Sequence, residues 1–260
     1  MRASDSETAA LIWRLWQDGE ATDSLPAGAR PTTRAEGYAI QAHLEAFSRR
    51  PRYGWKIAAT SLAGQRHINV DQPLAGRLLA ERIHAPGAVV ALAGNRMRVA
   101  EPEFGFRMAR ALAPRATPYA TDEVMAAVAD LHLTIELPDS RFVDFVAAGG
   151  PSLIADNACA RDLVVGPRVT ADWRGVDLAG HVVHAQVGTR YARDGLGANV
   201  LGDPRLALTW LVNELRGLGI TLGAGELVTT GTCVVPLEIQ PGDRVLGDFG
   251  MLGTIDVTLG

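Results

Sequence analysis

The sequence is poor in several features that would assign a protein class at once. Its 260 residues include two cysteines, Cys159 and Cys233, which form no CxxC pair and cannot build a disulfide framework. No apolar run approaches the ~20 residues that a membrane-spanning helix needs, and the N-terminal segment lacks the apolar core of a secretory signal. A net charge of −4 gives no basic surface for nucleic acid. These absences predict a soluble, cytoplasmic protein without a nucleic-acid or membrane partner.

Lysine is almost absent. Lys56 is the only one, so the remaining 24 of the 25 cationic side chains are arginine. It lies between Trp55 and Ile57 in an apolar, strand-like run. Arginine stays protonated in any plausible environment, whereas a buried lysine can shift its pKa and exchange a proton. A surface residue left over in an arginine-rich composition is the alternative, but the apolar setting favours a functional role, and we predict that Lys56 is catalytic.

The predicted secondary structure changes from helices to short strands near residue 50. Residues 1–50 predict a helical N-terminal region, with an apolar stripe around Leu15 and a capping-box pattern from Thr33 to Glu36. Residues 51–260 predict a β-rich catalytic domain of short strands, at 87–93, 130–137, 182–187, 227–239 and 244–259. Two helices interrupt it, one beginning at Thr121 and one capped by Asp203. Because the strands come without regular βαβ alternation, the fold class is α+β with a mixed or antiparallel sheet.

Three glutamates form the candidate metal site. Glu101 and Glu103 flank Pro102, and on an extended backbone both side chains turn to one face, with the proline favouring an edge strand. Glu136 ends the polar face of a strand that also carries His132. Three carboxylates without a thiolate or histidine ligand suit Mg²⁺ or Mn²⁺ rather than zinc. A solvated strand face is the alternative for the first pair.

Other catalytic patterns are weak. His181 and His184 are three apart in a strand-like stretch, so they point to opposite faces. The sequence has no GxSxG nucleophile elbow, Walker loop or GxGxxG fingerprint. Cys159 has no evident base nearby and is interpreted as a small buried apolar residue.

An ordered set of short motifs resembles the 2-keto-4-pentenoate hydratase / 4-oxalocrotonate decarboxylase family, within the fumarylacetoacetate hydrolase superfamily. The resemblance runs from about Gly37 to the C-terminus. Its marks are Gly54-Trp55-Lys56-Ile57 with Thr60-Ser61, Val70-Asp71-Gln72-Pro73, Glu101-Pro102-Glu103, Glu136 with Asp139-Ser140-Arg141, Asp156-Asn157-Ala158, the segment from Gly197 to Pro204, and Pro241-Gly242-Asp243.

The resemblance implies a fumarylacetoacetate hydrolase-like mixed β-roll, a divalent metal (Mg²⁺ or Mn²⁺) and a homo-oligomer. It assigns the metal to Glu101, Glu103 and Glu136, and places Lys56 in the substrate pocket. Substrate contacts are predicted for Thr60, Ser61, Asp139, Arg141, Asn157 and Thr230. The stretch around Thr230 is alternatively an ordinary strand end.

The implied activity is metal-dependent addition of water to a short unsaturated 2-oxo acid, such as 2-hydroxypenta-2,4-dienoate, in aromatic catabolism. Such an acid can chelate the ion through its carboxylate and keto oxygens. One departure matters: Leu74 and Ala75 stand where family hydratases commonly carry an acid and an aromatic. That acid is a candidate proton-transfer group. Decarboxylation, acylpyruvate-type C–C hydrolysis and a non-catalytic partner subunit are therefore alternatives.

Overall fold

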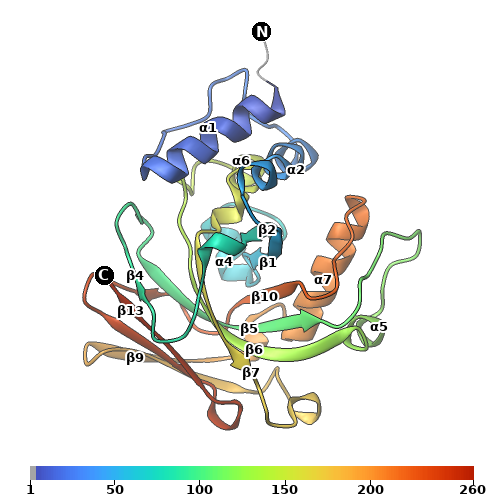
Figure 1. The fold of residues 1–260 in the computed structure, drawn as a ribbon, viewed down its shortest axis with the longest axis vertical. Helices are drawn as coiled ribbons and strands as arrows, with labels where there is room; N and C mark the ends of the chain where they lie inside the picture. The colour runs from blue at the N-terminus through green and yellow to red at the C-terminus, as the bar shows by residue number, and fades with distance from the viewer. Residues whose placement is uncertain (1–3) are drawn as a thin grey trace.

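The computed structural model, which describes residues 4–260, begins with three helices (Figure 1): α1 (Asp5–Asp18), α2 (Arg34–Ala42) and α3 (Leu44–Phe47). Ser4 caps α1 and Thr33 caps α2, and in both a glutamate side chain returns to the cap backbone. The predicted helices are thus confirmed, while residues 1–3 of that region lie outside the described residues. Ile12 belongs to the same buried cluster as strand residues, so the division at residue 50 stays a prediction.

The larger sheet has the order β2-β1-β10-β5-β6-β7-β3, with β11 beside β5. Its strands are β1 (Arg52–Ala58), β2 (Leu74–Leu79), β3 (Ile83–His84), β5 (Val99–Met108), β6 (Val128–Leu137), β7 (Asp162–Arg168), β10 (Leu227–Thr232) and β11 (Leu237–Glu238). β1 runs parallel to β10, whereas β5 and β6 are antiparallel. A Cβ atom at Gly54 would lie 1.8 Å from the carbonyl oxygen of Leu227, so only glycine fits at this point of the β1–β10 pair.

The smaller sheet has the order β4-β13-β12-β8-β9. Its strands are β4 (Val89–Val90), β8 (Val182–Val187), β9 (Tyr191–Leu196), β12 (Arg244–Asp248) and β13 (Thr254–Leu259). Its strands β9 and β13 lie at the left and lower left of Figure 1, and β13 contacts β6 and β7 directly. Along β8 buried and more exposed residues alternate, as expected for a strand that covers a core with one face. The α+β class with a mixed β-roll is confirmed.

The remaining α-helices within residues 4–260 are α4 (Leu62–His67), α5 (Thr121–Met125), α6 (Gly150–Ala155) and α7 (Pro204–Gly217). Asp203 caps α7 by accepting a hydrogen bond from the amide of Arg205 at 2.7 Å, as predicted. The helix predicted at Thr121 exists but is short. Within the described residues, no helix is both long and apolar enough to cross a bilayer.

The edge position predicted from Pro102 is wrong. β5 lies between β10 and β6, in the interior of the larger sheet. The Pro102 carbonyl accepts a hydrogen bond from the Cys233 amide at 3.0 Å, after β10 has ended at Thr232. The N and O of one strand residue point to the same side, so the missing N–H of Pro102 falls in the gap between β10 and β11. A proline is tolerated there because no ladder bond is lost.

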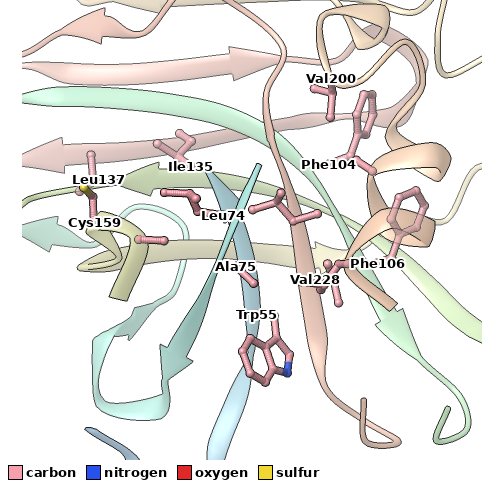
Figure 2. Close-up of a cluster of buried hydrophobic side chains, with 14 of the residues drawn as sticks. Trp55, Leu74, Ala75, Phe104, Phe106, Ile135, Leu137, Cys159, Val200 and Val228 are labelled. Carbon is pink, nitrogen blue, oxygen red and sulfur yellow. The ribbon is translucent and has the colours of Figure 1, made fainter. Parts of the chain in front are cut away.

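The core fills the space between the two sheets and the helices. Figure 2 shows part of it, including Trp55, Phe104, Phe106 and Val228, all of them fully buried. These side chains come from β1, β5 and β10, the adjacent strands that also carry the candidate site residues. The candidate site residues therefore lie on strands that are anchored in the buried core, as a preorganised site requires.

Candidate active site

The three predicted metal ligands converge. Glu101 and Glu103 lie on β5, two residues apart, and Glu101 pairs with Glu136 across the antiparallel β5–β6 ladder. One carboxylate oxygen from each of the three glutamates lies within 4.8 Å of the others. Alternation along β5 and register between the strands thus place the three side chains on one face of the sheet.

Burial makes this cluster electrostatically unusual. Glu103 and Glu136 are fully buried, and burial followed by repulsion from Glu136 raises the pKa of Glu101 to about 7. Burial likewise raises the pKa of Glu103 and of Glu136. Buried carboxylates repel one another unless a proton or a cation lies between them.

Unpaired oxygens indicate what the cluster can hold. Glu103 Oε1 and Glu136 Oε2 are buried and have no hydrogen-bond partner, an arrangement that costs free energy unless a ligand is present. A hard dication such as Mg²⁺ or Mn²⁺ takes oxygen ligands of this kind. The donor set therefore fits a divalent ion held by Glu101, Glu103 and Glu136.

Lys56 lies beside the glutamates, in keeping with the place in the substrate pocket that the family resemblance implies. The residue lies on β1 and is 2% exposed. Its Nζ lies 3.1 Å from Glu136 Oε1 and donates a hydrogen bond to the Ala158 carbonyl at 3.0 Å. Burial lowers the pKa of Lys56, but the nearby glutamates, Glu136 first, outweigh it and leave that pKa raised. The only lysine of the chain is thus an ammonium group buried next to the carboxylate cluster.

A left-handed turn presents the Ala158 carbonyl to Lys56. Three consecutive residues other than glycine, Asn157, Ala158 and Cys159, have φ of 58°, 51° and 60°. Such a run is costly and persists only where the surroundings hold it. The Asn157 side chain stabilises this turn, because it accepts a hydrogen bond from the Arg77 amide at 2.7 Å and donates one to the Arg77 carbonyl at 2.8 Å. The sequence offered only an Asx residue as a signal for this turn.

Gly231 completes the wall around Glu103. Its amide donates to Glu103 Oε2 at 2.8 Å, and its φ is +98°. A Cβ atom there would lie 2.1 Å from the Thr60 hydroxyl oxygen, so the close approach requires glycine. This residue was missed as a site residue, although a glycine inside a strand-like run indicates close backbone contact.

A cavity of about 640 Å³ opens beside the cluster. Lys56 and Glu101 line it, together with the predicted substrate-contact residues Thr60 and Ser61. Thr60 is buried, while the Ser61 hydroxyl caps α4 by accepting from the Gly64 amide at 3.0 Å. The structure therefore brings the ammonium of Lys56, the carboxylate cluster and the hydroxyl groups of Thr60 and Ser61 to one cavity.

Four further predicted substrate-contact residues lie outside the cavity lining. Asp139 accepts from two backbone amides, Arg141 forms a buried ion pair with Asp156, and Thr230 donates to a backbone carbonyl of β5. Asn157 holds the left-handed turn. Their contact with substrate stays a prediction from the family resemblance, whereas the partners shown here position the walls of the site.

Comparison with known proteins identifies relatives of the chain, although no protein-family profile matches it. It is 34% identical over 194 residues to a 2-hydroxyhexa-2,4-dienoate hydratase from Comamonas testosteroni, which covers 74% of this chain and 72% of the relative. It is 29% identical over 259 residues to 2-keto-4-pentenoate hydratase 1 from Dechloromonas aromatica, with 97% and 95% covered. A 4-oxalocrotonate decarboxylase from Pseudomonas putida, at 30% identity, covers 78% of this chain and 75% of that protein.

Solved structures support the same relationship at the level of the fold. The 4-oxalocrotonate decarboxylase from Pseudomonas putida G7, complexed with magnesium and adipate, superimposes with a TM-score of 0.90 over 100% of both chains, at 23% sequence identity. By its relatives above 30% identity, its fold and its converging glutamates, the chain belongs to the 2-keto-4-pentenoate hydratase / 4-oxalocrotonate decarboxylase family of the fumarylacetoacetate hydrolase superfamily.

Proposed function

We propose that this protein is a Mg²⁺- or Mn²⁺-dependent hydratase, a hydro-lyase of aromatic catabolism. Its substrate would be an unsaturated 2-oxo acid of the 2-hydroxypenta-2,4-dienoate kind. The observation that carries the proposal is the convergence of Glu101, Glu103 and Glu136 beside the ammonium of Lys56. The hydratase names of the relatives support it, as does the magnesium in the similar decarboxylase structure.

The ion would be held by the three glutamates and would supply Lewis acidity toward the keto oxygen of a chelating 2-oxo acid. Lys56 is the cationic side chain that lines the cavity. It can stabilise negative charge on the enolate oxygen or carry the relocated proton. Thr60 and Ser61 also line the cavity, and in this proposal their hydroxyls orient the substrate or the attacking water.

The reaction balances as one proton relocation followed by one addition of water. The dienol loses the proton of its 2-hydroxyl group and gains one at the far end of the diene, which gives an α,β-unsaturated ketone. Water then adds its oxygen to the carbon β to the ketone and a proton to the α carbon. The product is a saturated hydroxy-2-oxo acid, and no oxidant or second substrate is needed.

Leu74 supports a second candidate function. It pairs with Ala58 across β1 and β2 and is buried, so an apolar group stands next to the strand of Lys56. An acid at this position would be a proton donor or acceptor for hydration. Its absence favours decarboxylation or C–C hydrolysis as the rival activity, and a non-catalytic partner subunit as the rival from another class.

A spectroscopic screen tests the proposal. Purified protein with Mg²⁺ is expected to remove the dienol absorbance of 2-hydroxypenta-2,4-dienoate or a substituted analogue, and EDTA is expected to stop the loss. Product analysis separates the rivals, because release of CO₂ or of two acids excludes simple hydration. Metal-loaded protein that consumes no 2-oxo acid but raises the activity of a partner enzyme would refute the proposal in favour of the subunit role.

Two further predictions concern the setting of the enzyme. The family resemblance implies a homo-oligomer, and the sequence features predict a location in the cytoplasm. The exposed side chains of Val182 and Leu196, which pair across β8 and β9, are compatible with a subunit contact. Native mass spectrometry of the full chain measures the subunit number directly.

A further inference from the structure

We infer that the cavity takes a 2-oxo acid whose far end is an uncharged apolar group larger than the vinyl end of a pentadienoate. This inference rests on the proposed function, because the carboxylate cluster and Lys56 are taken to hold the acid head. It adds the chemical class of the substrate's far end, which is called the tail below. The support comes from the cavity walls, their charge and their size.

The walls change character away from the glutamates. Val99 lies two residues before Glu101 on β5 and therefore shares its face of the strand, and Met97 continues the lining past the strand end. The lining also includes Ile68, Phe145 and Val234, which are apolar as well. A ligand held by its acid head at Glu101 would thus place its other end against hydrocarbon.

The lining offers no cation for a second carboxylate. Lys56 is the only lysine or arginine that lines the cavity within residues 4–260, although the chain has 24 arginines. His67 also lines the cavity, and its ring packs edge-on against Phe145 with centroids 5.9 Å apart. A terminal carboxylate among these residues would lose hydration without gaining an ion pair.

The cavity is large for a short acid. Its volume of about 640 Å³ lies in the range of roughly 300–1,000 Å³ that is typical of sites for drug-sized ligands. A pentadienoate would leave most of the apolar wall in contact with water. An alkyl or aryl substituent would cover that wall, so the fit improves with an uncharged tail and worsens with a dicarboxylic acid such as 4-oxalocrotonate.

Binding of saturated 2-oxo acids tests the tail independently of catalysis, because they have no double bond to hydrate. Calorimetry with Mg²⁺ present is expected to show Kd falling about fourfold per added methylene from 2-oxobutanoate to 2-oxohexanoate and 2-oxooctanoate, the factor for burying one CH₂ group. 2-Oxoadipate matches 2-oxohexanoate in chain length and adds a carboxylate. It is expected to bind about tenfold more weakly or worse.

Two variants locate the tail in this cavity. Phe145→Ala should weaken binding of 2-oxooctanoate while leaving 2-oxobutanoate unchanged. Val143→Ala is the matched control, because Val143 lies in the same loop, is 62% exposed and does not line the cavity. Val235 lines the cavity but is 67% exposed, so Val235→Arg should fold and should reverse the preference toward 2-oxoadipate.

The outcomes separate the two proposals. Metal-dependent binding of every acid with one Kd, or tighter binding of 2-oxoadipate to the unmodified protein, overturns the apolar tail and leaves the proposed function standing. No metal-dependent binding of any 2-oxo acid overturns the proposed function itself. A chain-length dependence that Phe145→Ala abolishes and Val143→Ala preserves supports the inference.

Discussion

Two substitutions of Lys56 separate the charge of its ammonium group from its chemistry. Lys56→Arg keeps a cation near Glu136 and removes the compact amine, whereas Lys56→Met removes both. The arginine side chain is longer, but Lys56 faces a cavity of about 640 Å³, so its extra atoms have room. We expect both variants to lose turnover and only the methionine variant to lose stability.

The expected loss of unfolding free energy follows from the burial of Lys56, and the expected loss of rate from its role as an acid–base group. Lys56 is 2% exposed and lies 3.1 Å from Glu136 Oε1, so the interaction is hardly screened by water. Removing one partner of such a pair costs about 3–5 kcal/mol of unfolding free energy. Loss of a positioned acid–base group lowers the rate by about 10²–10⁴-fold. Excess Mg²⁺ should restore part of the stability of Lys56→Met, because a dication compensates the same carboxylates.

Urea unfolding without metal, urea unfolding with Mg²⁺, and single-turnover loss of the dienol absorbance measure these effects. Lys56→Arg with near-normal turnover would remove the amine from the mechanism. Lys56→Met as stable as the unmodified protein in EDTA would refute the argument that the ammonium balances the buried glutamates.

Three other predictions concern the metal, the pH dependence and the buried ion pair. Glu103→Gln should weaken Mg²⁺ or Mn²⁺ binding by more than the roughly 10–100-fold that is typical of losing an outer-shell partner. The control Glu20→Gln changes an exposed glutamate and should leave the metal affinity unchanged. If calorimetry gave Glu103→Gln the same metal affinity as the unmodified protein, the ligand assignment would be contradicted. Burial lowers the pKa of His132 below its ordinary value of 6.5, so the unfolded chain binds a proton that the folded protein excludes. The contribution of His132 to stability should therefore be complete above pH 6.5 and be lost as the pH drops below it. His132→Gln should remove this contribution to the slope in urea titrations, and an unchanged slope would assign it to other groups. Asp156→Asn should cost about 3–5 kcal/mol, because it leaves the buried guanidinium of Arg141 without its carboxylate; a loss under about 1 kcal/mol in urea unfolding would refute this.

Residue chemistry and strand alternation predicted part of the candidate site. Lys56 was notable as a single amine in an arginine-rich chain, and alternation placed Glu101 and Glu103 on one face. That Glu136 would lie opposite Glu101 could not be derived from spacing, because register depends on which strands become neighbours. The family resemblance supplied that link.

Other features depend on tertiary structure and were not predictable from local pattern. Pro102 favours an edge by its own chemistry, yet the end of β10 leaves a gap that accommodates it inside the sheet. The left-handed backbone around Ala158 contains no glycine from which it could have been predicted. It is held by contacts made by Asn157 with a residue far away in sequence.

The solitary lysine also provides a built-in reporter of sheet opening. A protease that cuts only after lysine has one bond to cleave in the whole chain, between Lys56 and Ile57, in a buried strand of the larger sheet. No surface clip can obscure the result, so the appearance of two fragments would time the separation of β1 from its neighbours, and magnesium should slow it.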